Sequence, residues 1–272
     1  MTDIMDPGSD KYTEALRIIA VAEKKGVPLK LIGGMAVKLH SGRWGQFLEA
    51  VMQRHPADLD FMTLSKFRVG TIGILQGLGY APMRTIMPQA DRIILVDKHD
   101  MHVDVFFDKL TMCHVIDFRD RLEIDSQTIS LSDILLSKLQ IVKINEKDIK
   151  DVMILLREHD VGNQENETIN GVYISKLFAN DWGFYHTATT NLRLVRDRLK
   201  DNHYKSIFKE EDVTDMRNKI DELLDMIEKE PKSMAWKIRA RSGPKKKWYQ
   251  DVEEVRVGGE FEKELAKLLK GN

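Results

Sequence analysis

Residues 29–40 read LKLIGGMAVKLH, and this stretch decides the first part of the fold. Residues 29–32 are apolar except for Lys30 and end at a glycine pair, which is typical of a buried strand that stops at a turn. The apolar residues of 35–39 then predict a short helix. Between a strand and a helix start, Gly33 and Gly34 let the backbone approach a phosphate, and free N–H groups there attract negative charge. The alternative is an ordinary turn.

Two further segments carry acidic residues in an apolar frame. Asp58 and Asp60 are two positions apart, so a strand would place both carboxylates on one face. Asp104 lies inside the apolar run HVDVFF, where a lone carboxylate is costly unless it is paired or bound to a metal. If the two strands are neighbours, three carboxylates converge, and such oxygen ligands suit Mg²⁺ or Mn²⁺. The alternatives are exposed strand acids and, for Asp104, a salt bridge.

Hydrophobic spacing outlines the other elements of the first half. We expect a hairpin turn at Lys98–His99–Asp100 between two strands, and Ser132 as the cap of a helix. The expected strands lie at 92–96, 102–107 and near 122–129, and the expected helices at 12–25, near 72–78, after 132 and at 149–156. This order predicts an α+β fold class with a small mixed β-sheet flanked by helices.

The second half reads as almost exclusively helical. Residues 162–170 are polar and form the best linker candidate. The expected helices beyond it lie at 191–199, 213–227 and 261–269. We therefore predict two domains. Residues 1–160 would form a catalytic domain, and residues 171–272 would form a helical C-terminal domain that could bind the acceptor, the molecule on which the catalytic domain acts.

Composition narrows the class of protein. Hydrophobic residues make up 42% and charged residues 31% of the 272 residues, as in a globular protein. The formal net charge of -1 gives no global attraction for nucleic acid, so any such attraction must be local. The sequence shows no secretory signal and no apolar run that could span a bilayer, and the single Cys113 excludes an internal disulfide. We expect a cytoplasmic protein with no membrane partner.

Three segments together resemble the nucleotidyltransferase superfamily that includes DNA polymerase beta. They are LIGGMAVKLH at 31–40, ADLDF at 57–61 and HVDVF at 102–106. The likeness covers about residues 12–158 and is strongest to stand-alone prokaryotic transferases of the abortive-infection toxin type.

This resemblance implies a role for each residue of the site. Asp58 and Asp60 would bind both metal ions, and Asp104 would bind one of them and help to deprotonate the attacking hydroxyl. Gly33 and Gly34 would lie by the phosphates of a nucleoside triphosphate.

The resemblance extends to a lysine in the helix after the sheet. Lys138, in LLSKL, would contact the triphosphate, and the alternative is an ordinary solvated helix lysine. Asp148 and Asp151 are expected to be structural. The sequence departs from the family in two ways. The gap from Gly34 to Asp58 is longer than in the smallest members, and many relatives have serine in place of Gly34.

A basic and aromatic segment, Lys232–Tyr249, suggests a partner. It holds seven Lys and Arg residues and no acid, interleaved with Trp236, Trp248 and Tyr249. Basic groups bind phosphates and aromatic rings stack on bases, so RNA or a tRNA end is a candidate acceptor. The alternative is a solvated loop whose tryptophans pack on the helices. Arg54 is a candidate for neutralising phosphate, with a surface salt bridge as its alternative.

We therefore expect a metal-dependent nucleotidyltransferase with Mg²⁺ or Mn²⁺ as cofactor. It would transfer a nucleoside monophosphate from a nucleoside triphosphate to a hydroxyl of RNA or tRNA, of a protein or of a small molecule. The alternative is a catalytically silent nucleotide- or RNA-binding regulatory module. His99, His102 and His114 lack ligand spacing, so we expect no zinc site, and His40 is expected to end a helix. The acceptor, the preferred nucleotide, the oligomeric state and any toxin–antitoxin pairing stay open.

Overall fold

A mixed five-stranded sheet organises the N-terminal half of the chain. The computed structural model describes residues 7–56, 58–83 and 91–252. In the sheet, β2 and β5 are parallel, and the other neighbouring strands are antiparallel. The strands, in their order across the sheet, are β1 (Lys30–Leu31), β2 (Leu59–Thr63), β5 (His102–Phe107), β4 (Arg92–Val96) and β3 (Ala81–Pro82).

The hairpin of β4 and β5 matches the sequence prediction at both strands. Its turn closes with the N–H of Asp100 donating to the carbonyl oxygen of Asp97 over 3.2 Å. Asp100 has φ 63°, a left-handed conformation that Asp tolerates better than most residues. The turn therefore forms without the usual Asn-Gly pair.

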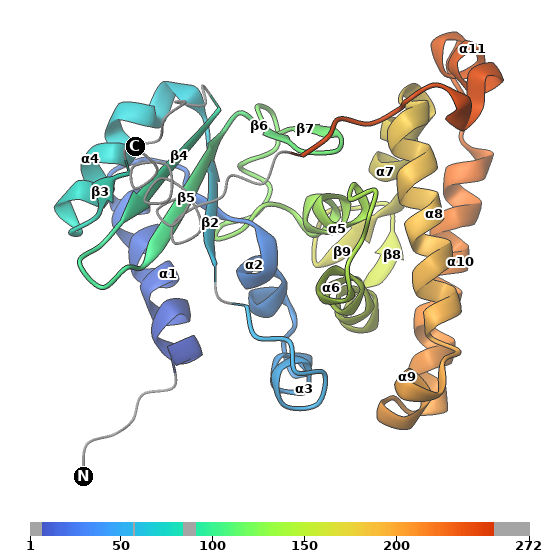
Figure 1. Cartoon of the computed structure of the whole chain (residues 1–272), viewed down its shortest axis with the longest axis horizontal. Coiled ribbons are helices and arrows are strands. Elements are labelled where there is room, and N and C mark those ends of the chain that lie inside the picture. Colours follow the sequence, from blue (N-terminus) through green and yellow to red (C-terminus); the bar gives the residue numbers. More distant parts are fainter. Residues whose placement is uncertain (1–6, 57, 84–90, 253–272) are drawn as a thin grey trace, which may run out of the picture.

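Four helices lie in the described part of the chain before β3, and the short α3 among them packs against α2 and α6. Helix α2 packs against β2 on one side and against α5 (Leu131–Leu139) and α6 (Glu146–Glu158) on the other. It thus joins the sheet to the helical half of the molecule (Figure 1). The four helices are α1 (Pro7–Lys24), α2 (Gly33–His40), α3 (Trp44–Ala50) and α4 (Arg68–Gly77), with the 3-10 turn η1 (Ser65–Phe67) before α4.

The C-terminal half is mainly helical, and the α+β class is confirmed. Helix α10 is amphipathic, and its buried residues follow helical spacing and face α7 and α8. One continuous cluster of buried hydrophobic side chains extends from α1 to α10. The helices after α6 are α7 (Gly171–Asn180), α8 (Trp182–Arg198), α9 (Asn202–Ile207), α10 (Glu210–Lys229) and α11 (Met234–Ser242), followed by the turn η2 (Gly243–Lys245).

Three details of the sequence prediction were wrong, and a fourth lies outside the structure. Ser130, not Ser132, caps α5, because its Oγ accepts the N–H of Asp133 over 3.2 Å. The segment 122–129 forms turns and one isolated bridge rather than a strand. The ends of the expected linker instead form β8 (Asp160–Gly162) and β9 (Thr168–Asn170), which pair with each other. The expected helix at 261–269 lies outside the described residues, and the division into two domains stays a prediction.

The last described residues return from α11 to the N-terminal half. They approach the hairpin of β6 (Lys109–Thr111) and β7 (Val115–Asp117), as Figure 1 shows. The N–H of Gln250 donates to the carbonyl oxygen of Cys113 in that hairpin over 3.0 Å. Cys113 is buried.

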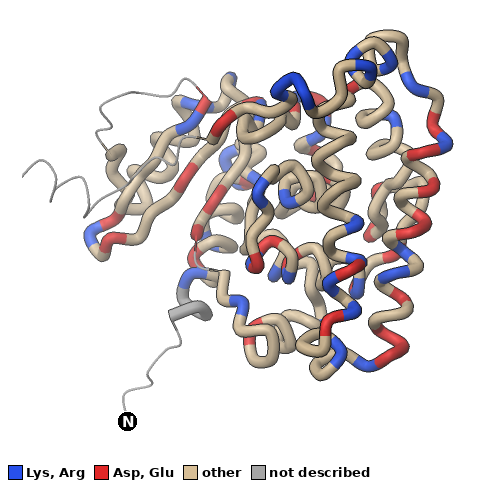
Figure 2. The backbone as a smooth tube through the Cα atoms, turned by 45° about the vertical axis from the view of Figure 1, so that its right-hand side comes forward, with Lys and Arg blue, Asp and Glu red and all other residues tan. Residues whose placement is uncertain are grey.

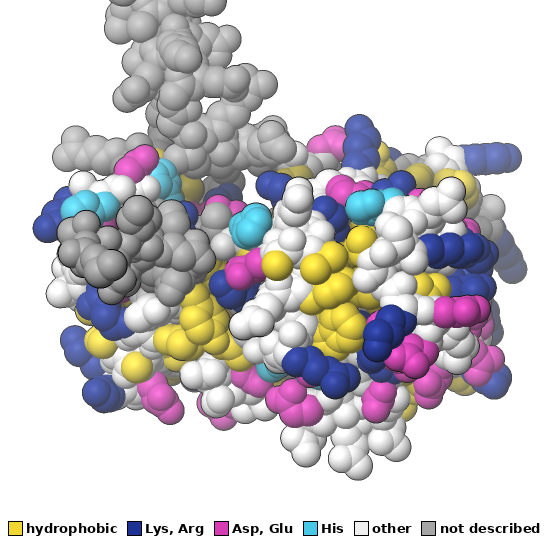
Figure 3. All heavy atoms as spheres, turned by 90° about the horizontal axis from the view of Figure 1, so that it is seen from below, with side chains coloured by type: hydrophobic (Ala, Val, Ile, Leu, Met, Phe, Trp, Pro, Cys, Tyr) yellow, Lys and Arg dark blue, Asp and Glu magenta, His cyan; other side chains and the backbone are white. Residues whose placement is uncertain are grey.

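Charged side chains of both signs are mixed over much of the surface. Acidic and basic positions alternate along the long helices of the C-terminal half (Figure 2). On the face seen in Figure 3, Lys and Arg again stand among Asp and Glu, with hydrophobic groups between them. This pattern agrees with the net charge of -1. No helix in the described part of the chain has the length and apolar character needed to cross a membrane.

Candidate functional site

Two carboxylates lie side by side where β2 meets β5. Asp60 and Asp104 are direct register partners in this parallel pair, so both side chains leave the same face of the sheet. Both are half-buried. The two acidic strands are therefore neighbours, which was the condition for convergence of the carboxylates. Asp58 lies just before β2 rather than inside it and is exposed.

Gly33 lies directly against the carboxylate of Asp60. Its φ of 68° is in the left-handed region, and a Cβ at this position would lie 2.8 Å from Oδ2 of Asp60. The N–H of Ile32 donates to the carbonyl oxygen of Asp60 over 2.9 Å. The start of α2 is thus fixed to β2, and only glycine meets both the backbone and the spatial requirement.

The electrostatic surroundings disfavour a charged Asp60. Burial, followed by the nearby Asp104 and Asp58, raises the pKa of Asp60 to about 7, although Lys138 and Arg92 oppose the shift. A cation between these carboxylates would reverse this preference, because an opposite charge favours the ionised form. The donor set is made of oxygen atoms, which suits Mg²⁺ or Mn²⁺.

Arg92 is a member of this site that the sequence prediction missed. It forms an ion pair with Asp104 from the neighbouring strand β4. In the register of that pair Ile94 faces Asp104, and Arg92 lies two positions along on the same face. A basic residue at this spacing in the predicted strand 92–96 was the available signal.

Beneath the second glycine lies a partly buried arginine, Arg54. A Cβ on Gly34 would collide with Nη2 of Arg54 and lie 3.2 Å from Cβ of Pro56. Arg54 donates from Nε and Nη2 to the two carboxylate oxygens of Asp151 over 2.9 and 3.0 Å. Asp151 is fully buried. The salt bridge considered for Arg54 is therefore present, but it lies largely inside the protein rather than on the surface.

Lys138 belongs to the same network. Its Nζ lies 3.0 Å from Asp148 and 2.9 Å from Asp151, and only 7% of the residue is exposed. Burial lowers the pKa of Lys138, but the two carboxylates outweigh it, so the pKa is raised and the lysine is charged. The alternative of a solvated helix lysine is wrong. Asp148 and Asp151 have the structural role expected of them.

A different group of side chains shows the closest convergence of ligand atoms. Among the described residues, one set of three His, Cys, Asp or Glu donors has its ligand atoms within 4.8 Å of one another, namely His40, His159 and Glu167. The three aspartates do not meet this spacing. His40 ends α2 as expected, but the sequence analysis did not connect it with the other two.

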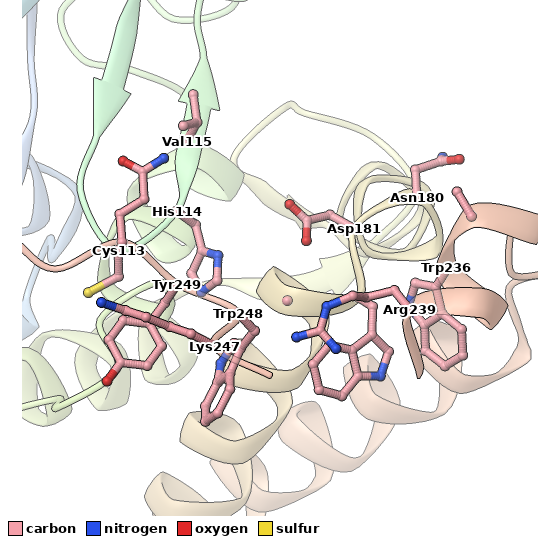
Figure 4. A pocket seen from close by; sticks show the side chains of 14 residues that line it. Cys113, His114, Val115, Asn180, Asp181, Trp236, Arg239, Lys247, Trp248 and Tyr249 are labelled. Carbon is pink, nitrogen blue, oxygen red and sulfur yellow. The ribbon is translucent and has the colours of Figure 1, made fainter. Parts of the chain in front are cut away.

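The basic and aromatic segment borders a separate cavity of about 540 Å³. Figure 4 shows Arg239 and Trp236 of α11 at this cavity, with Trp248 and His114 also along its lining. The guanidinium of Arg239 stands 4.4 Å from the ring centre of Trp182. The remaining walls come from the β6–β7 turn, residues 180–183 and residues 247–250.

The aromatic rings at this cavity are packed against the helices. Nε1 of Trp248 donates to Oγ1 of Thr187 over 3.0 Å, and Trp182 stacks on His186 with 5.0 Å between ring centres. Trp182 is buried. Packing of tryptophans on the helices is therefore found, while RNA binding by this segment stays a prediction.

Comparisons with known proteins return little. No protein-family model and no curated protein matches the chain. Among solved structures, the chain is similar to the solution structure of the antibiotic-resistance factor ANT(2'')-Ia, which is described as showing substrate-regulated conformation dynamics. The two share 16% identity, the match covers 65% of this chain and 97% of the other, and the TM-score is 0.41. A likeness at this level carries no argument about function.

Proposed function

We propose that the protein is a metal-dependent nucleotidyltransferase. The observation that supports this most is the pairing of Asp60 with Asp104 on parallel strands, with Gly33 against the carboxylate of Asp60. This arrangement brings two acidic strands and the start of a helix to one place. The salt bridge considered for Asp104 is present, with Arg92, so Asp60 is the carboxylate of this pair that a metal ion would have to neutralise.

The start of α2 would receive the phosphates. Its first N–H groups have no partner within the helix, and the helix dipole adds to their attraction for anions. Gly33 and Gly34 allow a close approach because no Cβ stands in the way. The charges of Arg54 and Lys138 lie behind this turn and would add to the positive potential, although both are held by Asp151.

The carboxylates would hold the divalent ions. Asp58, Asp60 and Asp104 are the proposed ligands, and Mg²⁺ or Mn²⁺ would supply charge neutralisation at the phosphates. Arg92 would act as a positioning residue, because its ion pair fixes the side chain of Asp104.

The proposed reaction is an in-line displacement at the α-phosphorus. The acceptor oxygen forms a new bond to phosphorus, the bond to the bridging oxygen of pyrophosphate breaks, and pyrophosphate leaves with that electron pair. Asp104 is the proposed acceptor of the hydroxyl proton. The acceptor would be RNA or tRNA, a protein or a small molecule, and the exposed lysines of Lys232–Tyr249 favour testing RNA first.

Pyrophosphate release tests the proposal directly. Each of the four nucleoside triphosphates is incubated with Mg²⁺ or Mn²⁺, with and without bulk tRNA, and the Asp58→Asn/Asp60→Asn double variant serves as the blank. Release that depends on tRNA and vanishes in the variant would support a transferase acting on RNA. Equal release by both proteins would overturn the assignment. Tight nucleotide binding without release, across RNA, protein and small-molecule acceptors, would favour the silent regulatory module.

A further inference from the structure

We propose a transition-metal site formed by His40, His159 and Glu167, separate from the three aspartates. His40 is the last residue of α2, His159 directly follows α6, and Glu167 directly precedes β9. Both histidines are buried, whereas the side chain of Glu167 is 69% exposed. The ends of two helices and one loop therefore meet at a point that solvent can reach past Glu167.

Hydrogen bonds fix the ring of His40. The hydroxyl of Thr128 donates to the carbonyl oxygen of Ile129 over 2.6 Å, so its Oγ1 is left to accept from His40. Nε2 of His40 lies 2.7 Å from this oxygen and therefore carries the proton. Its Nδ1 is left with a lone pair.

The ring of His159 is fixed in the same sense. Its Nε2 lies 2.7 Å from the carbonyl oxygen of His40, which can only accept, so Nε2 carries the proton. A histidine that binds a metal through one nitrogen commonly donates its other N–H to a carbonyl oxygen or similar acceptor. Both rings thus donate from Nε2 to an oxygen acceptor, as metal-binding histidines do, and leave Nδ1 on the side of Glu167.

The inward atoms converge on the carboxylate. Oε2 of Glu167 lies 4.0 Å from Nδ1 of His40 and 3.8 Å from Nδ1 of His159. Nδ1 of His159 also lies 3.3 Å from the carbonyl oxygen of Glu167. This nitrogen therefore faces only acceptors, and a positive centre is needed between them. Zinc bonds of about 2.0–2.1 Å in a tetrahedral site require ligand atoms about 3.3 Å apart. The three atoms lie within 4.8 Å of one another, so the side chains would have to draw together around the ion.

The donor set selects the type of ion. Two imidazole nitrogens and one carboxylate oxygen suit Zn²⁺ and other first-row transition ions, whereas Mg²⁺ prefers oxygen ligands alone. Three protein ligands leave a fourth position for water. Bound here, the ion would tie the end of α2 to the end of α6 and so stabilise the helix that begins at Gly33.

Metal binding to the full chain tests this site independently of any transfer activity. Zn²⁺ is titrated by calorimetry in the presence of millimolar Mg²⁺, and Co²⁺ is used as a spectroscopic probe of nitrogen ligands. We compare the wild type with Glu167→Gln, His159→Gln and, as a matched control, Glu211→Gln, which removes an exposed glutamate of α10. The Asp58→Asn/Asp60→Asn variant reports on the other site.

The expected result is one Zn²⁺ per chain and a thermal unfolding midpoint that rises with Zn²⁺ concentration. Loss of an outer partner of a metal ligand weakens binding by about 10- to 100-fold, and Glu167→Gln, which removes a direct ligand, should weaken it at least as much. Glu211→Gln and the aspartate double variant should bind as the wild type does. Binding lost in the aspartate variant but kept in Glu167→Gln would place the ion at the aspartates and overturn the proposal. Absence of Zn²⁺ binding in the folded wild type would also overturn it.

Discussion

Asp60 and Asp104 face each other across the parallel pair of β2 and β5, and both carboxylates leave the same side of the sheet. Nothing in their separation along the chain brings them together, and the strand pairing alone does so. This relationship is what makes the site a candidate for metal and phosphate chemistry.

Asp60→Asn should separate activity from stability. Removing this charge should lower nucleotidyl transfer by about 100-fold or more, the range seen when one group that stabilises charge in a reaction is lost. The unfolding midpoint should equal or exceed that of the wild type, because a half-buried carboxylate no longer faces Asp104. Pyrophosphate release and thermal unfolding measure the two effects. Asp100→Asn, on the exposed hairpin turn, is the matched control and should change neither; full transfer activity in Asp60→Asn would exclude the assignment.

Gly33→Ala should lower the free energy of unfolding by more than a left-handed backbone conformation alone explains. Gly26 has the same φ of 68° as Gly33, but a Cβ there meets nothing within 4 Å. Gly26→Ala should therefore cost about 1–2 kcal/mol of unfolding free energy, the price of a left-handed alanine. Gly33→Ala adds a contact with Oδ2 of Asp60, so it should cost more and also weaken nucleotide binding. Urea unfolding of both variants makes the comparison, and equal losses would mean that Asp60 simply moves aside.

Asp151→Asn should destabilise the chain strongly. Asp151 is fully buried and is the shared counter-ion of Arg54 and Lys138, so its loss leaves the partly buried Arg54 and the buried Lys138 without a full partner. We expect a loss of about 3–5 kcal/mol, as for other broken buried ion pairs. Asp148→Asn removes only one partner of Lys138 and should cost clearly less. Denaturant unfolding of the two variants tests this order, and a reversed order would show that Asp148 is the main counter-ion.

His114 should make stability depend on pH. Burial lowers the pKa of His114 to about 4, while an unfolded chain has a value near 6.5. The unfolded state therefore binds more protons between these values, so the contribution is present above pH 6.5 and is lost as the pH falls towards 4. The loss is at most roughly 3 kcal/mol. In His114→Gln, which does not titrate, the fall in unfolding free energy from pH 7 to pH 4 should be smaller, and an unchanged fall would count against a buried neutral histidine.

Lys245 and Lys246 should contribute to RNA binding if the basic segment holds RNA. Both are exposed, unlike Arg239, whose guanidinium donates to the carbonyl oxygens of Gly243 and Lys246. Replacing both lysines with glutamine should weaken binding of bulk tRNA and reduce the slope of log K against log salt by roughly 1.5, as two lost phosphate contacts require. Fluorescence anisotropy at several salt concentrations measures this.

A control that also removes two positive charges is available at the two ends of α10. Lys209→Gln/Lys229→Gln removes two exposed lysines near the ends of that helix. It should leave both the affinity and the salt slope unchanged. If the two double variants weaken binding equally, the affinity for tRNA depends only on the net charge of the protein.

Local patterns predicted the parts of the fold that depend on neighbours along the chain. The strands at 92–96 and 102–107 are apolar runs separated by a polar turn, and both bounds were right. The cap of α5 was misplaced because Ser130 and Ser132 are both good capping residues. Ser132 instead accepts the N–H of Asn170 over 2.8 Å, a contact that no local pattern contains.

The parts of the site that the sequence did not reveal depend on distant partners. Arg54 and Asp151 are 97 positions apart, and the bond between His159 and His40 spans 119 positions. A spacing rule detects ligands on one helix or in one loop, so it cannot detect histidines at the ends of two different helices. The place of Arg92 in the site was detectable in principle. Its strand was predicted correctly, and the pairing of that strand with 102–107 puts Arg92 on the same face as Asp104.

The order of the strands also has a consequence for synthesis. Because β2 pairs not only with β1, the strand before it, but also with the distant β5, the central ladder cannot be complete until residue 107 has left the ribosome. The hydrogen bond from Gln250 to Cys113 cannot form until residue 250 has been synthesised. Pairings between such distant segments close slowly, since the entropy of a long loop is lost before the contacts form. A nascent chain arrested before β5 would therefore carry Asp58 and Asp60 without their partner strand and should depend on chaperones at that stage.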